Sequence, residues 1–463
     1  MLSKLRVLFT PKNMTEGAPW KRIAEFAVPM LLGNMAQQLY NTVDSIVVGK
    51  YVGDNALAAV GSASPVLNLL LALFVGIATG AGIVISQYFG AKNREKLSQA
   101  IGNCITLAAI ASLITMVVGS LVARPLLLLL DTPASILDWC VDYLVIFCLG
   151  SAGFTFYNIL SGILRGMGDS FSALGFLLIA ASLNIFLDIW FVAGFGMGVP
   201  GVSLATVISQ GISAVFCLFK LMRMRNVFDL NRSALKLRKD ISLRIIRVGI
   251  PSGITQAIMS LAMLVVQNLT NTMGEAVIAA NVIIMRVDGF AMMPNMSFGQ
   301  AMSVYTGQNV GAQRLDRVDK GVKQGLIISV SFATAITVAI LIFGKVMFGF
   351  FTTTQSLIEL AYSMMRILAV GYICMAVTQV LGGVMRGAGD TVTPMWISMI
   401  STIVIRVPLA YGLAALTSAG EWPHGHPFAL SISLVVSWLL GMLISTVIFR
   451  VGKWRKKAEG ALL

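Results

Sequence analysis

Three acidic side chains lie deep inside apolar stretches of this chain, where an ionised group is unfavourable. They are Asp44, Asp188 and Asp288, out of twenty aspartates and glutamates. A carboxylate in the hydrocarbon region of a membrane costs about 2.5–3.5 kcal/mol even on permissive scales, so an acid there is by default a functional candidate. Asn184 precedes Asp188 by four residues, so one helix face presents an amide and a carboxylate together. This pairing predicts an ion site.

A structural role is the alternative interpretation of these buried polar groups, since they also hydrogen-bond neighbouring helices in membrane bundles. It applies most directly to Asp288. Arg286 stands two residues before it, and Arg366 and Arg406 lie in later apolar stretches. A purely structural ion pair between Asp288 and one of these arginines therefore stays open beside a substrate or coupling role.

The composition places the chain in a membrane. Hydrophobic residues make up 57% of the 463 residues, charged residues make up 12%, and the mean hydropathy is +0.84, which excludes a soluble globular domain. Stretches of roughly 20 apolar residues, enough to cross a hydrocarbon core of ~30 Å, occur about twelve times. Strands of a transmembrane barrel would be ~10 residues long and alternate in polarity, so we expect helices. The expected spans are residues 23–49, 60–88, 98–123, 136–164, 169–193, 200–224, 242–272, 281–308, 320–343, 357–385, 391–416 and 427–450.

The chain is also internally duplicated. The motif Arg165-Gly-Met-Gly-Asp169 returns 221 residues later as Arg386-Gly-Ala-Gly-Asp390, and Gln87-x-x-Gly-Ala91 returns at the same offset as Gln308-x-x-Gly-Ala312. Such repeats are typical of secondary transporters. Because one repeat contains six expected spans, both halves enter the membrane in the same direction. We therefore predict an all-α polytopic protein with two six-helix lobes related by a pseudo-two-fold axis along the membrane normal.

The positive charges orient the protein. With a cytoplasmic N-terminus, 28 of the 34 lysines and arginines fall on cytoplasmic segments and span ends, and three fall on the opposite side. This asymmetry follows the positive-inside rule, so the net charge of +14 does not indicate nucleic acid. The expected divisions are a cytoplasmic N-terminal segment 1–22, an N-lobe 23–224, a cytoplasmic linker 225–241, a C-lobe 242–450 and a cytoplasmic tail 451–463.

Enzyme chemistry is not expected. The sequence holds no Gly-x-Ser-x-Gly, no His-Glu-x-x-His and no phosphate-binding loop, and its two histidines both lie in the loop before the last span. We expect no cofactor other than a coupling ion, no nucleic-acid partner, contact with membrane lipid and a monomeric protein.

The motifs resemble the multidrug and toxic compound extrusion (MATE) transporters over nearly the whole chain. The resemblance rests on the two repeated motifs together with Tyr40-Asn-Thr-Val-Asp44, Gly76-Ile-Ala-Thr-Gly80, the Asn184 and Asp188 pair, and Gly201-Val-Ser-Leu-Ala-Thr206. It implies twelve helices in two lobes that open in a V shape, and antiport of organic cations against sodium or protons in a bacterial inner membrane.

The resemblance also implies a set of coupling residues. The family's cation site in the N-lobe matches Asp44, Asn158, Asn184, Asp188 and Thr206 of this chain. Oxygen donors that include two carboxylates, Asp44 and Asp188, suit a hard monovalent cation. The NorM-like branch has carboxylates on the seventh and tenth helices, where this chain offers Gln256, Asn268 and Gln379, so the sequence leans toward the DinF-like and related branches.

Two further features bear on the mechanism. Pro29 removes a backbone hydrogen bond from the first helix and predicts a hinge there. Asp288, Arg286, Gln256 and Met292 are candidate substrate or coupling residues of the C-lobe, and the methionines fit an adaptable drug surface. The alternatives are a flippase for a lipid-linked saccharide, for which extra helices and a strongly cationic cavity are expected, and a receptor or scaffold without transport.

Overall fold

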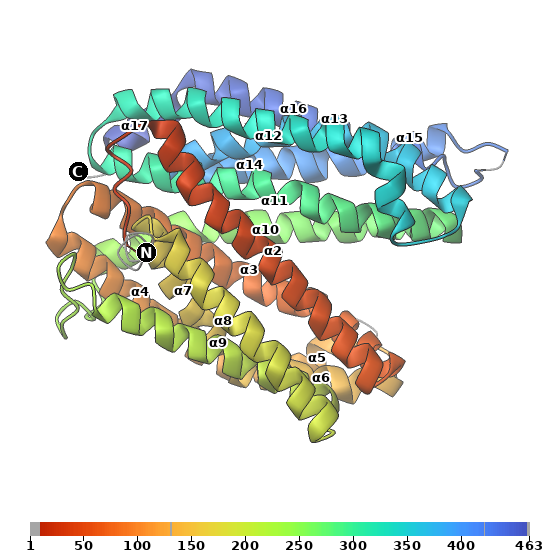
Figure 1. The fold of residues 1–463 in the computed structure, drawn as a ribbon, viewed down its shortest axis with the longest axis horizontal. Coiled ribbons are helices and arrows are strands. Elements are labelled where there is room, and N and C mark those ends of the chain that lie inside the picture. The colour runs from red at the N-terminus through yellow and green to blue at the C-terminus, as the bar shows by residue number, and fades with distance from the viewer. Residues whose placement is uncertain (1–9, 130–131, 421, 461–463) are drawn as a thin grey trace. The chain divides into compact units, whose positions relative to one another are not determined.

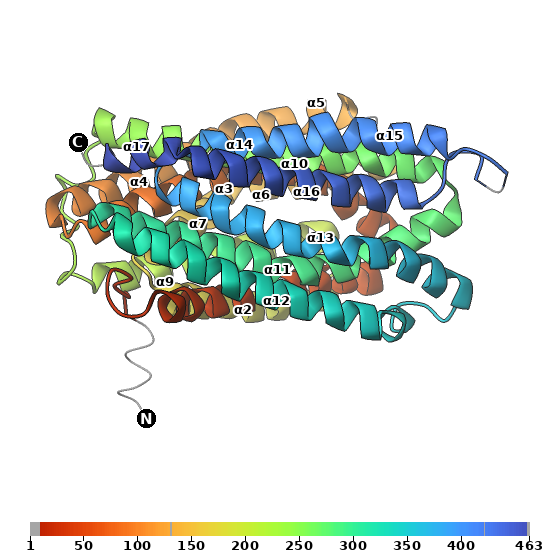
Figure 2. The same cartoon turned by 90° about the horizontal axis from the view of Figure 1, so that it is seen from above.

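The computed structural model describes residues 10–129, 132–420 and 422–460, and it is built of helices (Figures 1 and 2). No strand occurs in these ranges beyond an isolated bridge between Ala419 and Trp422. The helices of the first half are α2 (Pro19–Tyr51), α3 (Asp54–Gly90), α4 (Arg94–Ile114), η1 (Thr115–Gly119), α5 (Ser120–Leu129), α6 (Ala134–Leu149), α7 (Ser151–Gly166), α8 (Ser170–Asp188), η2 (Ile189–Gly194) and α9 (Gly198–Met222). Those of the second half are α10 (Lys239–Thr272), α11 (Glu275–Gly311), α12 (Leu315–Gly349), α13 (Gln355–Gly387), α14 (Val392–Met399), η3 (Ile400–Ile405), α15 (Arg406–Leu416), α16 (Phe428–Val451) and α17 (Lys453–Glu459).

Many of these helices are long and apolar enough to span a membrane. Within the described residues nine pass that test, and α6 with α7, bent by 53° at Gly150, forms a tenth if the pair is one span. Expected spans coincide with helices, as for 391–416, which becomes α14, η3 and α15 (Val392–Leu416). The predicted all-α membrane fold is confirmed, whereas the number twelve stays a prediction.

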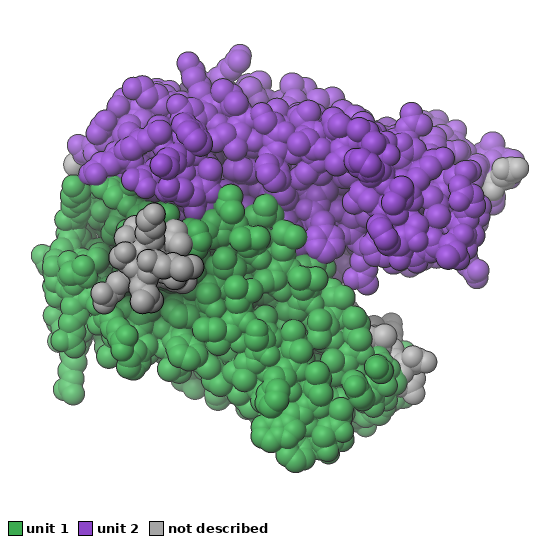
Figure 3. All heavy atoms as spheres, viewed as in Figure 1, with its two compact units in different colours: residues 1–13, 28–253 green, residues 14–27, 254–463 purple. Residues whose placement is uncertain are grey.

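The chain divides into two compact units, coloured separately in Figure 3. Unit 1 comprises residues 1–13 and 28–253, and unit 2 comprises residues 14–27 and 254–463. The limits between units thus fall inside α2, next to Pro29, and inside α10, close to Pro251. The lobe boundaries expected from the sequence stay a prediction, and residues 1–9 and 461–463 of the predicted terminal segments lie outside the described residues.

In unit 1, α3 packs against α4, α6 and α7, while α9 packs against α6, α7 and α8. Small residues allow the closest approaches. A Cβ atom added to Gly166 of α7 would lie 2.6 Å from the carbonyl oxygen of Gly82 in α3. Apolar side chains of α3, α5 and α6, including Leu127, Cys140 and Leu144, form a buried cluster around the first half of α3. The result is a rigid frame for the helices that carry the polar residues.

In unit 2, α13 is the central helix and packs against α11, α12 and α16. Its contact with α11 is very close, because a Cβ atom on Gly383 would lie 2.2 Å from the carbonyl oxygen of Gly299. Glycine on transmembrane helices permits such backbone contact. The large buried side chains Tyr372 and Phe348 fill the remaining core.

Replacing Gly383 by alanine should therefore destabilise the protein, because the methyl group would displace backbone rather than a flexible side chain. We expect a loss of about 1–3 kcal/mol, typical of overpacking, seen as a lower melting temperature in detergent. Gly412→Ala is the matched control, since nothing lies within 4 Å of a Cβ atom there. Equal melting temperatures for the two variants would contradict the close contact.

The duplicated Arg-Gly-x-Gly-Asp motif performs the same structural task in each unit. Asp169 accepts hydrogen bonds from the Ser172 amide (2.9 Å) and hydroxyl (2.7 Å), which caps α8. Asp390 accepts the same two bonds from Thr393, at 3.3 Å and 2.7 Å, and also pairs with the Lys457 ammonium at 2.7 Å. The preceding Gly168 and Gly389 have φ of 84° and 90°, which favour glycine. In both units the aspartate of the motif therefore holds the start of the following helix.

In each unit, the glutamine of the duplicated Gln-x-x-Gly-Ala motif accepts a hydrogen bond from a residue near the start of a lobe's first helix. In unit 2, Gln308 accepts from the Met14 amide at 2.8 Å, and the neighbouring Asn309 donates to the Met14 carbonyl oxygen at 3.3 Å. In unit 1, Gln87 accepts from the Arg244 guanidinium of α10 at 2.5 Å. We call residues 14–20 the N-terminal strap.

Candidate cation-binding site

Three helices of unit 1 present the polar residues of the candidate site. Asp44 follows Tyr40 by one turn on α2, Asp188 follows Asn184 by one turn on α8, and Thr206 lies on α9. The four-residue spacing places each pair on one helix face. Asn184 and Asp188 are fully buried, Tyr40 is 7% exposed, and Asp44 is half-buried.

The amide of Asn184 joins the two acids. With its nitrogen facing the carboxylates, Nδ2 donates to Asp44 Oδ1 at 2.8 Å and to Asp188 Oδ2 at 3.0 Å. Its oxygen then accepts from the Thr206 backbone amide at 3.2 Å. This orientation is assigned from the hydrogen-bond network, because it satisfies both ends of the amide. The Tyr40 hydroxyl donates to Thr206 Oγ1 at 3.2 Å and also contacts Asp44.

The carboxyl groups of Asp44 and Asp188 lie close together, since one oxygen of each is within 3.0 Å of the same Asn184 nitrogen. Two carboxylates this close cannot both stay ionised without a proton or a cation between them. Asp188 Oδ1 is buried and has no hydrogen-bond partner in the part of the chain that the structure describes. A buried oxygen without a donor is suited to a bound cation or a carboxyl proton, so the donor set fits a monovalent ion.

The surroundings of the acids are apolar and locally irregular. Immediately after Asp188, α8 changes into the π-helix η2, a feature that often occurs at functional sites. The valines that line this region, Val47 and Val48 of α2 with Val192, Val199 and Val202, form a buried cluster. Exclusion of water by these side chains strengthens electrostatic interactions at the two acids.

The structure adds residues that the sequence did not single out. Tyr40 is one, although its spacing of four from Asp44 is a signal that a search for polar pairs would have found. Tyr143 of α6 is the other, and its hydroxyl lies close enough to interact electrostatically with both acids. No local spacing identifies Tyr143, because it lies far from either acid in the sequence.

Asn158, the fifth expected site residue, is not joined to the other four by a hydrogen bond in the described residues. Its amide donates to the Phe154 carbonyl oxygen at 2.9 Å, one turn earlier in α7. No group of three or more His, Cys, Asp or Glu side chains in the described ranges is arranged to hold a metal ion. The geometry therefore offers two acids and neutral oxygens to a cation.

The candidate residues of the second half form a separate arrangement in unit 2. Asp288 of α11 accepts a hydrogen bond from the Tyr372 hydroxyl at 2.9 Å. Arg406, which follows the π-helix η3, is the arginine close enough to interact with this carboxylate, and its buried Nε lacks a partner among the described residues. Arg286 is exposed on the same helix as Asp288.

Two further candidate residues of unit 2 are Gln256 and Met292. Gln256 is an exposed residue of α10. Met292 packs against the buried core of unit 2. The structure shows neither of them in a hydrogen bond with Asp288.

The long apolar helices are those of a multi-pass membrane protein that carries a pair of acids, and comparison with known proteins shows its family. The MatE family model matches the chain twice, over residues 29–190 and 251–412, in agreement with the internal repeat. The chain therefore belongs to the MatE family, the multidrug efflux transporters that the motifs resemble.

Two curated relatives are similar over nearly the whole chain. A probable multidrug resistance protein of Bacillus subtilis (strain 168), YoeA, is 28% identical over 427 residues, covering 90% of this chain and 92% of its own length. A probable multidrug resistance protein of Thermotoga maritima, NorM, is 25% identical over 445 residues, covering 95% and 94%. Both relatives are described as probable multidrug resistance proteins, and the flippase alternative is not favoured.

A solved structure shows the same fold. It is the outward-facing conformation of a multidrug resistance MATE family transporter, which matches with a TM-score of 0.89 at 24% identity and covers 96% of this chain and 99% of its own. This likeness supports the two-lobe fold.

Proposed function

We propose that this protein is a secondary active antiporter that exports organic cations and drugs in exchange for sodium ions or protons. The observation that carries the proposal is the closeness of Asp44 and Asp188, whose carboxylates both accept from the Asn184 amide. The multidrug names of the relatives support the class of substrate. The proposed coupling residues are Asp44, Asn184, Asp188 and Thr206, and Asn158 is included only on the resemblance to the family.

The mechanism rests on charge neutralisation. One proton or one sodium ion between the two carboxylates removes their repulsion, and its departure restores it. A ligand shifts an inward/outward equilibrium only through different affinities for the two states. If the coupling ion and the organic cation favour opposite states, each lowers the affinity for the other, which is the requirement for exchange.

The organic cation would bind an apolar and adaptable surface. Asp288 with Tyr372, together with Arg286, Gln256 and Met292, supplies the proposed contacts in unit 2. The Asp288 carboxylate retains an oxygen not used by Tyr372, although Arg406 competes for it. In this proposal the C-lobe orients substrate, and the N-lobe acids bind the coupling ion. The protein works as a monomer in a bacterial inner membrane, in the branch closer to DinF-like than to NorM-like proteins.

The direct test is efflux of ethidium in everted vesicles, energised separately by a sodium gradient and by a proton gradient. We expect ethidium accumulation under at least one gradient and none without a gradient. Vesicles that accumulate no organic cation under either gradient, with the protein present and folded, would rule out the antiporter.

Pro29 is expected to be the point at which α2 bends. It lies inside the helix, two residues after the limit between the units at residues 27 and 28. Pro29→Ala restores an amide donor and removes the ring clash, so the helix should straighten and the protein should stay folded while efflux slows. Efflux rate and melting temperature are compared with those of Pro251→Ala, the corresponding change in α10. An unchanged efflux rate in Pro29→Ala would contradict a hinge role for Pro29.

The proposed topology places both termini and residues 220–247 in the cytoplasm. Arg232 is exposed between α9 and α10, so a cysteine at this position is accessible to reagent. In a background without the five native cysteines, Arg232→Cys should react with an impermeant thiol reagent only after the membrane is opened. Labelling of this cysteine from outside intact cells would show that the proposed topology is wrong.

A further inference from the structure

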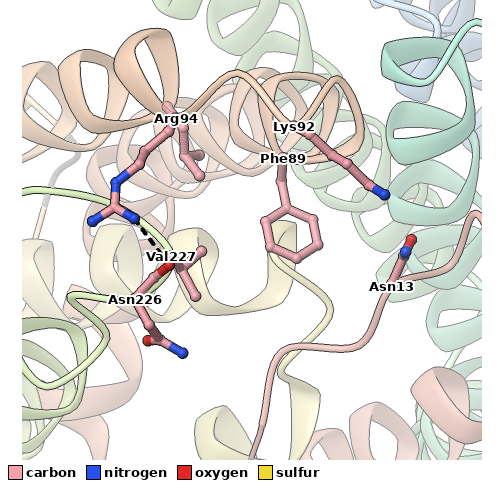
Figure 4. Close-up of a pocket in the computed structure, with 7 residues that line it drawn as sticks. Asn13, Phe89, Lys92, Arg94, Asn226 and Val227 are labelled. Atoms are coloured by element: carbon pink, nitrogen blue, oxygen red, sulfur yellow. Dashed lines mark hydrogen bonds between the residues drawn. The ribbon is translucent and has the colours of Figure 1, made fainter.

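A cavity of about 350 Å³ opens in unit 1, away from the paired acids. Four separate segments line it (Figure 4): Asn13 before α2, Phe89 and Lys92 at the end of α3, Arg94 and Leu97 at the start of α4, and Asn226 with Val227 after α9. In Figure 4 the Lys92 ammonium points toward Asn13 and the Phe89 ring lies between them and Arg94.

Only one of the two cations at this cavity is neutralised by an acid. The guanidinium of Arg94 binds both carboxylate oxygens of Asp229, at 2.7 Å and 2.8 Å, and donates to the Asn226 carbonyl oxygen at 3.2 Å. This contact holds the pKa of Asp229 below its usual value. Lys92 is exposed and forms no ion pair in the described residues. The cavity therefore carries one unbalanced positive charge.

The backbone conformation of Lys92 is unusual for a residue other than glycine. Lys92 has φ of 54°, a left-handed conformation that costs a non-glycine residue roughly 1–2 kcal/mol. Hydrogen bonds from the Lys92 amide to Phe89 O (3.1 Å) and from the Asn93 amide to Tyr88 O (3.2 Å) hold the turn. The corresponding turn of the second half has Gln313 at φ of 56°. The left-handed turn is thus duplicated, with lysine at the left-handed position in unit 1 and glutamine at that position in unit 2.

The cavity lies at the ends of two apolar helices, which is where lipid headgroups are expected if these helices span the membrane. It lies where the apolar helix α3 ends at Gly90 and the membrane-spanning helix α4 begins at Arg94. Its apolar lining, from Phe89, Leu97 and Val227, suits the glycerol and first methylene groups of a lipid. Basic pockets between helices on the cytoplasmic side of a membrane are sites at which anionic headgroups bind.

We propose that this cavity binds the phosphate headgroup of an anionic glycerophospholipid. The Lys92 ammonium pairs with the phosphate, the side chains of Asn13 and Asn226 border the headgroup, and Val227 and Leu97 contact the start of the acyl chains. The site is independent of the proposed antiport, because it shares no residue with the paired acids and its test measures lipid binding alone.

The test uses the full-length protein, purified and stripped of lipid, titrated with fluorescent phosphatidylglycerol and with phosphatidylcholine in detergent. We expect saturable binding of one phosphatidylglycerol and weaker binding of phosphatidylcholine. Lys92→Gln should weaken phosphatidylglycerol binding about fivefold, as for one lysine at a membrane surface. Val227→Phe fills the cavity without changing its charge and should weaken both lipids.

Lys96→Gln is the matched control, because Lys96 is an exposed lysine in the first turn of α4 that does not line the cavity. The Lys96→Gln variant should bind both lipids with the same affinity as the unsubstituted protein. If Lys92→Gln and Lys96→Gln weakened phosphatidylglycerol binding equally, the binding would be due to diffuse surface charge and not to the cavity. Competition by soluble glycerol 3-phosphate at the same concentration as the lipid would assign the site to a free phosphate compound and overturn the lipid proposal. Melting temperatures of all variants exclude unfolding as the cause.

Discussion

Gradient-driven efflux should be lost when either Asp44 or Asp188 is changed to asparagine, while the protein stays folded. The substitution keeps the size and hydrogen-bonding capacity of the side chain and removes the charge that a coupling ion neutralises. Because the two carboxyl groups lie close together, removing one charge also removes their repulsion, so the melting temperature should hold or rise. We expect the efflux rate of each variant under a gradient to fall to the rate measured without a gradient.

The measurements are efflux in everted vesicles and the thermal shift caused by sodium or by a change in pH, on purified variants side by side. Both variants should lose the cation-induced shift along with efflux. Asp288→Asn is the matched comparison, since it changes a membrane-embedded acid held by Tyr372 in unit 2, and it should reduce efflux less. If the Asp44 and Asp188 variants showed robust efflux and Asp288→Asn were inactive, the coupling site would have to be assigned to unit 2.

The second large effect is expected at the N-terminal strap, residues 14–20. Asn309 is fully buried, and its amide donates to the carbonyl oxygens of Met14 (3.3 Å) and Tyr305 (2.8 Å) while accepting from Arg317 Nε (3.1 Å). Asn309→Ala leaves these groups without their partner, at a cost of about 1–3 kcal/mol for each buried group that stays unsatisfied. We expect a clearly lower melting temperature and faster tryptic cleavage at Lys21, which follows the strap.

Asn281→Ala is the control for this change, because Asn281 lies on the same helix and, within the described residues, its amide donates only to Met285 Sδ, at 3.7 Å. It should melt and be cleaved as the unchanged protein is. If Asn309→Ala matched it in both measurements, the bonds to Met14 would not hold the strap on unit 2.

Features that depend on local sequence were predictable. The apolar stretches predict helices because backbone groups in lipid must bond within their own segment. The spacing of Asn184 and Asp188 places them on one face because a helix turns once in 3.6 residues. The repeated motifs predict the duplication that the family match shows. Each inference needs only a few neighbouring residues or a comparison of the chain with itself.

Tertiary structure alone decided which distant residues meet. Three arginines were candidates for Asp288, and packing of α15 against the rest of unit 2 selects Arg406, 118 positions later in the chain. Tyr372 joins them from α13, and in unit 1 Tyr143 approaches the paired acids from α6. Asn158 instead bonds within its own helix. Helix periodicity specifies which face a side chain is on, but rotation and register against other helices depend on the packing of the whole bundle.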